Sequence, residues 1–156
     1  EIPLLNAQYK EVLLKHNMNF MYIFYWVVAF SVFAFILNLM REIIKDIEDY
    51  EGDRTYGRKS LPVTLGVKTS QNIVNFLAII TLSGLTYVYF RFLEDPFTLI
   101  YFLLFLYVPF IFLVVKNLKA TKRSDFEFIG NLLKVIMILG VLYALMARYI
   151  IQTQVI

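Results

Sequence analysis

The sequence predicts an all-α membrane protein, and two observations lead to this expectation. Of its 156 residues, 60% are hydrophobic and only 17% are charged, which is too apolar for a typical soluble domain of this length. The chain also contains windows free of charged residues, at 17–40, 69–90 and 96–115, and a fourth at 128–147 that only Lys134 interrupts. A helix that crosses ~30 Å of hydrocarbon needs about 20 residues. We therefore expect four transmembrane helices, which leave no room for a separate soluble domain.

The elements follow from these windows in order. The expected spans are 18–40, 69–90, 97–115 and 126–148, with a polar motif loop at 41–68. No Pro or Gly lies between residue 18 and Gly52, so the first helix can continue into that loop, and Gly52 can end it. Within the loop, Ser60 and Pro62 predict the start of a short helix that Gly66 ends. Thr69 and Ser70 are the expected caps of the second span.

The distribution of basic residues predicts the orientation in the membrane. Ten lysines and arginines fall in 41–68 and 116–123, on one side of the predicted bundle. The other side carries four, which are Lys10, Lys15, Arg91 and Arg148. Since cytoplasmic loops are the ones enriched in Lys and Arg, we expect the motif loop to face the cytoplasm.

The motif loop contains a stripe of acidic residues. On a helix at about 100° per residue, Glu42, Asp46, Asp49 and Asp53 share one face. Like charges at this spacing repel each other, so the stripe indicates a bound cation. Carboxylate oxygens are hard ligands suited to Mg²⁺, which often binds together with a phosphate group. We therefore predict Asp46, Asp49 and Asp53 as metal-binding and catalytic residues.

Polar and basic residues around the stripe complete the predicted site. Basic side chains are natural partners of phosphate, and Asn38 lies one turn before Glu42. The predicted substrate-binding residues are Asn38, Arg41, Lys45, Arg54, Arg58 and Lys59.

A simpler reading treats the same segment as a solvated helix end. In that reading Lys45 pairs with Glu42 or Asp49, the arginines are ordinary cytoplasmic loop charges, and Asn38 is a contact between helices. The sequence lacks the residues that several other functional classes require. The chain has no Cys and one His, and it has no Lys/Arg tract typical of a nucleic-acid surface.

The segment at 38–66 reads NLMREIIKDIEDYEGDRTYGRKSLPVTLG. It resembles the second aspartate-rich motif of the UbiA superfamily of intramembrane prenyltransferases. Asp46, Asp49, Gly52 and Asp53 match its DxxDxxGD core, and residues 59–66 match the trailing K-[ST]-L-P-x-x-L-G.

The resemblance implies a nine-helix bundle in which two aspartate-rich motifs hold Mg²⁺ on a prenyl diphosphate. This chain would supply four helices and the second motif, with residues 1–156 forming the C-terminal portion of the domain. The first motif is absent, because the remaining aspartates, Asp95 and Asp125, do not form one. The chain begins with Glu1 rather than Met, so we expect a fragment that is inactive without a missing N-terminal half.

The implied function is transfer of a prenyl group to a lipid or aromatic acceptor among membrane lipids. The segment REIIKDIEDYEGD is most similar to the corresponding segment of enzymes that prenylate geranylgeranylglyceryl phosphate. Enzymes of quinone and chlorophyll pathways are close alternatives. Two further alternatives remain open. One is a non-catalytic membrane subunit or small transporter, and the other is a bundle assembled from two such chains.

Overall fold

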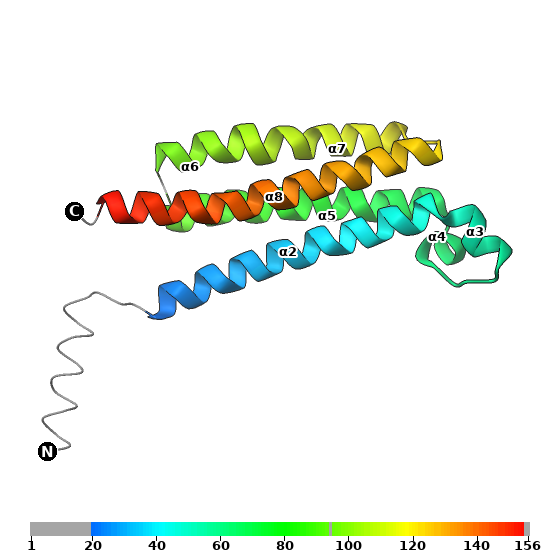
Figure 1. Cartoon of the computed structure of the whole chain (residues 1–156), viewed down its shortest axis with the longest axis horizontal. Helices are drawn as coiled ribbons and strands as arrows, with labels where there is room; N and C mark the ends of the chain where they lie inside the picture. The colour runs from blue at the N-terminus through cyan, green and yellow to red at the C-terminus, as the bar shows by residue number, and fades with distance from the viewer. Residues whose placement is uncertain (1–19, 94, 155–156) are drawn as a thin grey trace, which may run out of the picture. The chain divides into compact units, whose positions relative to one another are not determined.

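The computed structural model describes residues 20–93 and 95–154, and side chains over 24–93 and 95–146. Every element of the described chain is helical (Figure 1). Four helices are long and apolar enough to cross a membrane: Phe24–Glu48, Val67–Leu93, Pro96–Lys119 and Arg123–Met146. The predicted all-α class with four transmembrane helices is therefore confirmed. The start of the expected span 18–40, with Lys10 and Lys15, lies outside the described residues.

The chain divides into two units, residues 1–33 and 34–156. The described part of the first unit belongs to helix α2 (Phe20–Glu48). There Trp26 and Phe30, one turn apart, stack with their ring centroids 5.6 Å apart. The second unit contains the rest of α2, all the other helices and the whole polar segment.

The core of the second unit is built from three successive helical passes. Helix α5 (Val67–Val88) continues into the π-helical turn η1 (Tyr89–Leu93), and α6 (Pro96–Tyr101), η2 (Phe102–Tyr107) and α7 (Val108–Lys119) form the return. Helix α8 (Arg123–Gln154) is the last pass. Its buried residues alternate at spacings of three and four, the pattern of a helix packed along one seam. They are Phe126, Ile129, Leu133, Ile136, Gly140 and Tyr143.

Proline explains the irregular turn in the second of these passes. Pro109 lies in the first turn of α7, directly after η2. A proline within a helix donates no backbone hydrogen bond, and its ring crowds the carbonyl four residues earlier. The wider π-helical turn is one of the known ways in which a helix accommodates such a break.

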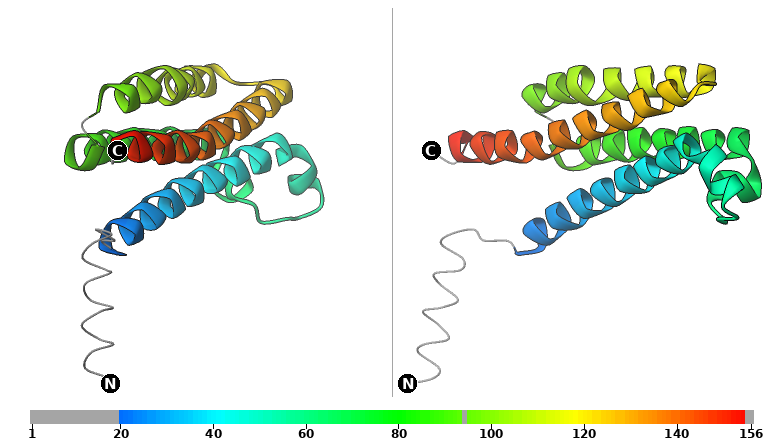
Figure 2. Two further views of the ribbon diagram at one scale, coloured as in Figure 1. Left: turned by 60° about the vertical axis from the view of Figure 1, so that its left-hand side comes forward. Right: turned by 45° about the vertical axis from the view of Figure 1, so that its right-hand side comes forward.

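The polar segment between α2 and α5 is itself largely helical. Helix α2 runs on to Glu48, and α3 (Tyr50–Thr55) and α4 (Leu61–Leu65) follow. Within the second unit, Ile44 of α2 faces Gly130 of α8, where an added Cβ would lie 3.8 Å from Ile44 Cγ2. Figures 1 and 2 show α3, α4 and the α7–α8 turn at the same end of this unit.

Two expectations about helix ends need correction. Gly52 lies inside α3, and the chain reverses at Gly57 instead, where φ is +71°. Thr69 and Ser70 lie inside α5, which begins at Val67 directly after Gly66. At Gly66 φ is 88° and ψ is 150°, a conformation open almost only to glycine, so the backbone turns there without a side-chain cap. Gly66 does end α4, as expected.

Candidate functional site

The acidic stripe crosses a slight break in the helix. Asp49 lies between α2 and α3 with φ −92° and ψ 6°. The hydrogen bonds carry through the break, because the Asp49 N–H donates to the Lys45 carbonyl at 3.0 Å and the Asp53 N–H to the Asp49 carbonyl at 3.0 Å. The stripe is therefore held by a nearly continuous helical backbone.

A Schellman motif at the end of α3 returns the chain over Asp53. The Arg58 N–H donates to the Asp53 carbonyl at 2.9 Å, and the Gly57 N–H donates to the Arg54 carbonyl at 3.4 Å. This pattern requires a left-handed residue at the position of Gly57. The turn brings Arg58 Nη1 to 3.5 Å from Asp53 Oδ1. Asp53 is only 7% exposed, so a mostly buried carboxylate is paired with a mostly exposed guanidinium.

A second basic residue reaches the acidic segment from the α7–α8 turn. Asp125 Oδ2 accepts hydrogen bonds from the backbone N–H groups of Thr121 at 3.2 Å and Lys122 at 3.1 Å. These bonds fix the turn from which Arg123 projects. Arg123 Nη2 lies 3.6 Å from Glu48 Oε1 and 3.5 Å from Asp49 Oδ1.

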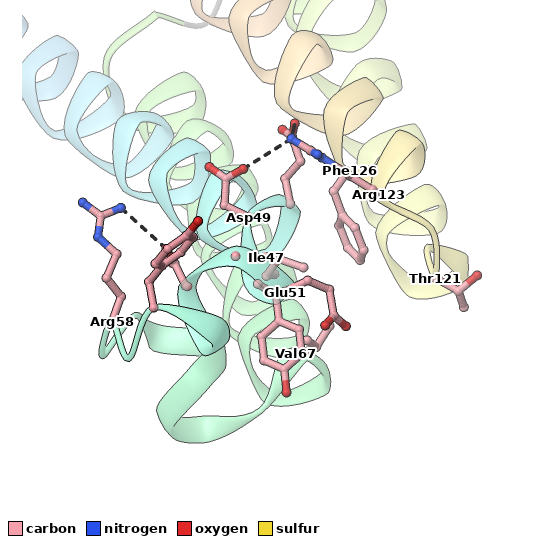
Figure 3. Close-up of a pocket in the computed structure, with 13 residues that line it drawn as sticks. Ile47, Asp49, Glu51, Arg58, Val67, Thr121, Arg123 and Phe126 are labelled. Carbon is pink, nitrogen blue, oxygen red and sulfur yellow. Dashed lines mark ion pairs between the residues drawn. The ribbon is translucent and has the colours of Figure 1, made fainter.

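These elements enclose an open cavity of about 710 Å³. Figure 3 shows Arg58 and Arg123 on opposite sides of Asp49. The lining comes from the end of α2, from α3, from the two turns and from the start of α5 and α8. The lining residues are Ile47, Glu48, Asp49, Tyr50, Glu51, Gly52, Asp53, Tyr56, Arg58, Val67, Thr121, Arg123 and Phe126.

The structure brings only some of the predicted site residues into this cavity. Asp49, Asp53 and Arg58 line it. Asp46 does not, although it is electrostatically coupled to Asp53 and its carboxylate faces the backbone N–H of Leu61. The remaining predicted residues also lie outside the lining. They are Asn38, Arg41, Lys45, Arg54 and Lys59.

The ion pairs expected for a merely solvated helix do not form. Among the described residues Lys45 pairs with neither Glu42 nor Asp49, and Glu42 instead lies 2.7 Å from its neighbour Arg41. The described residues also contain no group of three or more acidic or histidine side chains arranged to hold a metal ion. The three aspartates therefore do not form a closed metal cage from this chain alone.

Sequence reasoning missed Arg123. Two features of the sequence pointed to this residue. The loop at 116–123 was expected on the same side of the membrane as the motif loop, and Asp125 is a typical residue for the start of a helix. Which of the four basic residues in that loop reaches the acidic segment depends on the packing of α8, and the sequence pattern does not specify it.

Three relatives of the chain share one name. A digeranylgeranylglyceryl phosphate synthase of Methanosphaera stadtmanae is 37% identical over 94 residues, which are 59% of this chain and 33% of the relative. Proteins of the same name from Pyrococcus horikoshii and Thermococcus kodakarensis are 42% identical over 52 residues and 48% identical over 48 residues. These two matches cover 33% and 31% of this chain, and 19% and 17% of the relatives. The matched part is thus a third or less of each relative's length.

No solved structure gives a significant match to the chain. The model of the UbiA prenyltransferase family matches residues 12–137, which is most of the sequence. This match agrees with four helices able to cross a membrane and with the aspartate-rich segment that the family resemblance rested on. The chain is an integral membrane protein that belongs to the UbiA prenyltransferase family.

Proposed function

We propose that this chain forms part of a Mg²⁺-dependent enzyme that transfers a prenyl group from a polyprenyl diphosphate to a lipid acceptor. The observation that carries the proposal is the cavity at the polar end of an apolar helix bundle. Its walls place the carboxylates of Asp49 and Asp53 beside the guanidinium groups of Arg58 and Arg123. Family membership supports the same chemistry.

The residues present suit a cation that is shared with a phosphate. Asp53 is a mostly buried carboxylate whose ion-pair partner is exposed to solvent, so it keeps the capacity to bind a cation. Mg²⁺ usually binds through one or two carboxylates together with substrate phosphates and water. Asp49 and Asp53 are therefore the proposed ligands from this chain, and Asp46 adds negative potential behind them. This arrangement needs no three-carboxylate cage.

In the proposed reaction the bond between C1 of the prenyl chain and the diphosphate oxygen breaks. The diphosphate leaves with the bonding electrons, an acceptor hydroxyl oxygen forms the new bond to C1, and its proton passes to the aqueous side. Bound Mg²⁺ would supply stabilisation of the charge on the leaving diphosphate. Arg58 contributes positive charge at the same place, and the apolar helices keep water away from the allylic centre.

The names of the relatives favour a phosphate-bearing glyceryl lipid as the acceptor. Three related proteins are named digeranylgeranylglyceryl phosphate synthase, so geranylgeranylglyceryl phosphate is the first acceptor to test. Aromatic acceptors of quinone or chlorophyll pathways are the alternative.

We further propose that the chain is the C-terminal portion of the UbiA-type domain. The matches reach a third or less of the relatives' length, which supports a partner region with a first aspartate-rich motif. In this proposal the complete site lies in a nine-helix bundle, the motif segment 41–68 faces the cytoplasm, and the chain alone does not turn over substrate.

The test uses membranes that contain the complete protein in which this chain occurs. They receive radiolabelled geranylgeranyl diphosphate, geranylgeranylglyceryl phosphate and Mg²⁺. We expect Asp49→Asn and Asp53→Asn each to reduce transfer by about a hundredfold or more, as loss of a major charge-stabilising group does, and to leave helix content in detergent unchanged. Wild-type turnover in either variant would contradict the metal role.

A matched control separates a specific role from a general loss of charge. Glu42→Gln also removes one acidic charge from the stripe, but its side chain does not line the cavity. It should transfer at nearly the wild-type rate. The rival view, a non-catalytic membrane subunit or transporter, predicts no transfer from any variant and none from the wild type.

A further inference from the structure

We infer that Arg123 serves as an exchangeable counter-ion. It neutralises Asp49 while no metal is bound, and it turns to the diphosphate when a divalent cation takes Asp49. This inference rests on the proposed function, because it takes Asp49 as a metal ligand and a diphosphate as the ligand of the cavity. It assigns a positioning role to a residue outside the aspartate-rich motif.

The geometry places Arg123 where such an exchange can happen. Its Nη2 atom lies 3.5 Å from Asp49 and 3.6 Å from Glu48, so one nitrogen is shared between two carboxylates. A guanidinium has five N–H donors, and most of them remain available for other acceptors. The Arg123 side chain is 73% exposed, so its head group can move without disturbing a packed core.

The backbone that carries Arg123 is fixed, in contrast to its side chain. Asp125 binds the N–H groups of Thr121 and Lys122, and Phe126, which also lines the cavity, is 4% exposed and anchors the first turn of α8. A fixed backbone with a mobile head group keeps the guanidinium within reach of the cavity in either position.

The charges around the cavity explain why an exchange is needed. Four acidic side chains line it, from Glu48, Asp49, Glu51 and Asp53, and Arg58 and Arg123 are its basic lining residues. The lining therefore carries an excess of negative charge and repels a free diphosphate. A divalent cation cancels the two excess negative charges. When the cation binds Asp49, this carboxylate no longer attracts the Arg123 guanidinium. The guanidinium then turns to the anion that accompanies the cation.

The exchange predicts effects of opposite sign for one substitution. Arg123→Gln removes the competitor for Asp49, so binding of Mn²⁺ alone, measured from the loss of the free-ion EPR signal, should tighten by about two- to fivefold, the range of an exposed ion pair. Binding of geranylgeranyl thiolodiphosphate at saturating Mg²⁺, measured by calorimetry, should weaken by roughly tenfold, because a charge-assisted contact is lost.

The measurements use the complete protein in which this chain occurs, purified in detergent, with Lys122→Gln as the matched control. Lys122 carries the same charge in the same turn but does not line the cavity, so its substitution should change both affinities little. Arg123→Lys keeps the positive charge but loses the planar guanidinium group with its paired N–H donors. It should leave Mn²⁺ binding near the wild-type value and weaken binding of the analogue only partly.

A merely structural role predicts a different pattern. If Arg123→Gln weakens both ligands alike with a lower melting temperature, or changes neither affinity, the exchange role is wrong while the proposed function stands. If the complete wild-type protein fails to bind the analogue in the presence of Mg²⁺, the proposed function fails and the exchange role fails with it.

Discussion

Two polar regions of the second unit lie on the same helical framework but differ in kind. One is a buried amide cluster between α5 and α7. Gln71 Nε2 donates to the carbonyls of Asn117 at 2.9 Å and Ala120 at 3.0 Å. Asn117 Nδ2 donates to the Gln71 carbonyl at 3.0 Å and to Asn75 Oδ1 at 2.8 Å. The other is the charged cavity formed by α2, α3 and the two turns.

The difference between them distinguishes polar groups that stabilise the fold from polar groups that are suited to bind a ligand. The amide cluster is neutral, largely hydrogen-bonded and closed to solvent, with Asn117 0% exposed. Hydrogen bonds of this kind between helices stabilise membrane bundles. The cavity carries an excess of like charge, its ion pairs span 3.5–3.6 Å, and its guanidinium groups are exposed. Such pairs contribute little to stability, so their arrangement makes most sense as preparation for a ligand.

The largest effect on stability should come from the amide cluster. Asn117→Ala removes two hydrogen bonds and leaves the Gln71 carbonyl and Asn75 Oδ1 without those donors in a buried place. We expect a loss of roughly 2–3 kcal/mol in the free energy of unfolding. Thermal unfolding in detergent, followed by circular dichroism, measures it. An unchanged melting temperature would show that the cluster has no structural role.

A smaller effect should come from the turn that shapes the cavity. Gly57→Ala places a side chain at φ +71°, so it should cost about 1 kcal/mol in the free energy of unfolding and loosen the return of Arg58 to Asp53. Gly57→Asn is the control, because asparagine tolerates the left-handed conformation. If the two variants have equal melting temperatures below that of the wild type, the backbone conformation is not the cause.

Local features of the fold could be predicted from the sequence because each depends on neighbouring residues. The apolar windows predict the four long helices, and Pro62 and Gly66 predict the limits of α4. The expectation that Gly52 can end the first helix is wrong, because Gly52 lies inside α3 and the chain reverses at Gly57. Both glycines lie near the end of an acidic helix, and only the hydrogen bonds of the Schellman motif distinguish them.

Only those site residues that are neighbours in the sequence could be predicted from it. The spacing of Asp49 and Asp53 identifies them, and both line the cavity. Asp46 matches the same spacing but does not line the cavity, although its carboxylate interacts electrostatically with those of Asp53 and Asp49. Arg123 comes from a turn some seventy residues later in the sequence, and its approach depends on how α8 packs, which no local pattern encodes.

We propose that the carboxylates of the cavity bind a diphosphate through Mg²⁺. The decisive measurement is a calorimetric titration of the complete protein that contains this chain with geranylgeranyl thiolodiphosphate, first with Mg²⁺ and then with EDTA in its place. We predict binding that requires Mg²⁺, disappears in Asp53→Asn and persists in Glu42→Gln. Binding of equal strength in EDTA, or in Asp53→Asn, would contradict the claim.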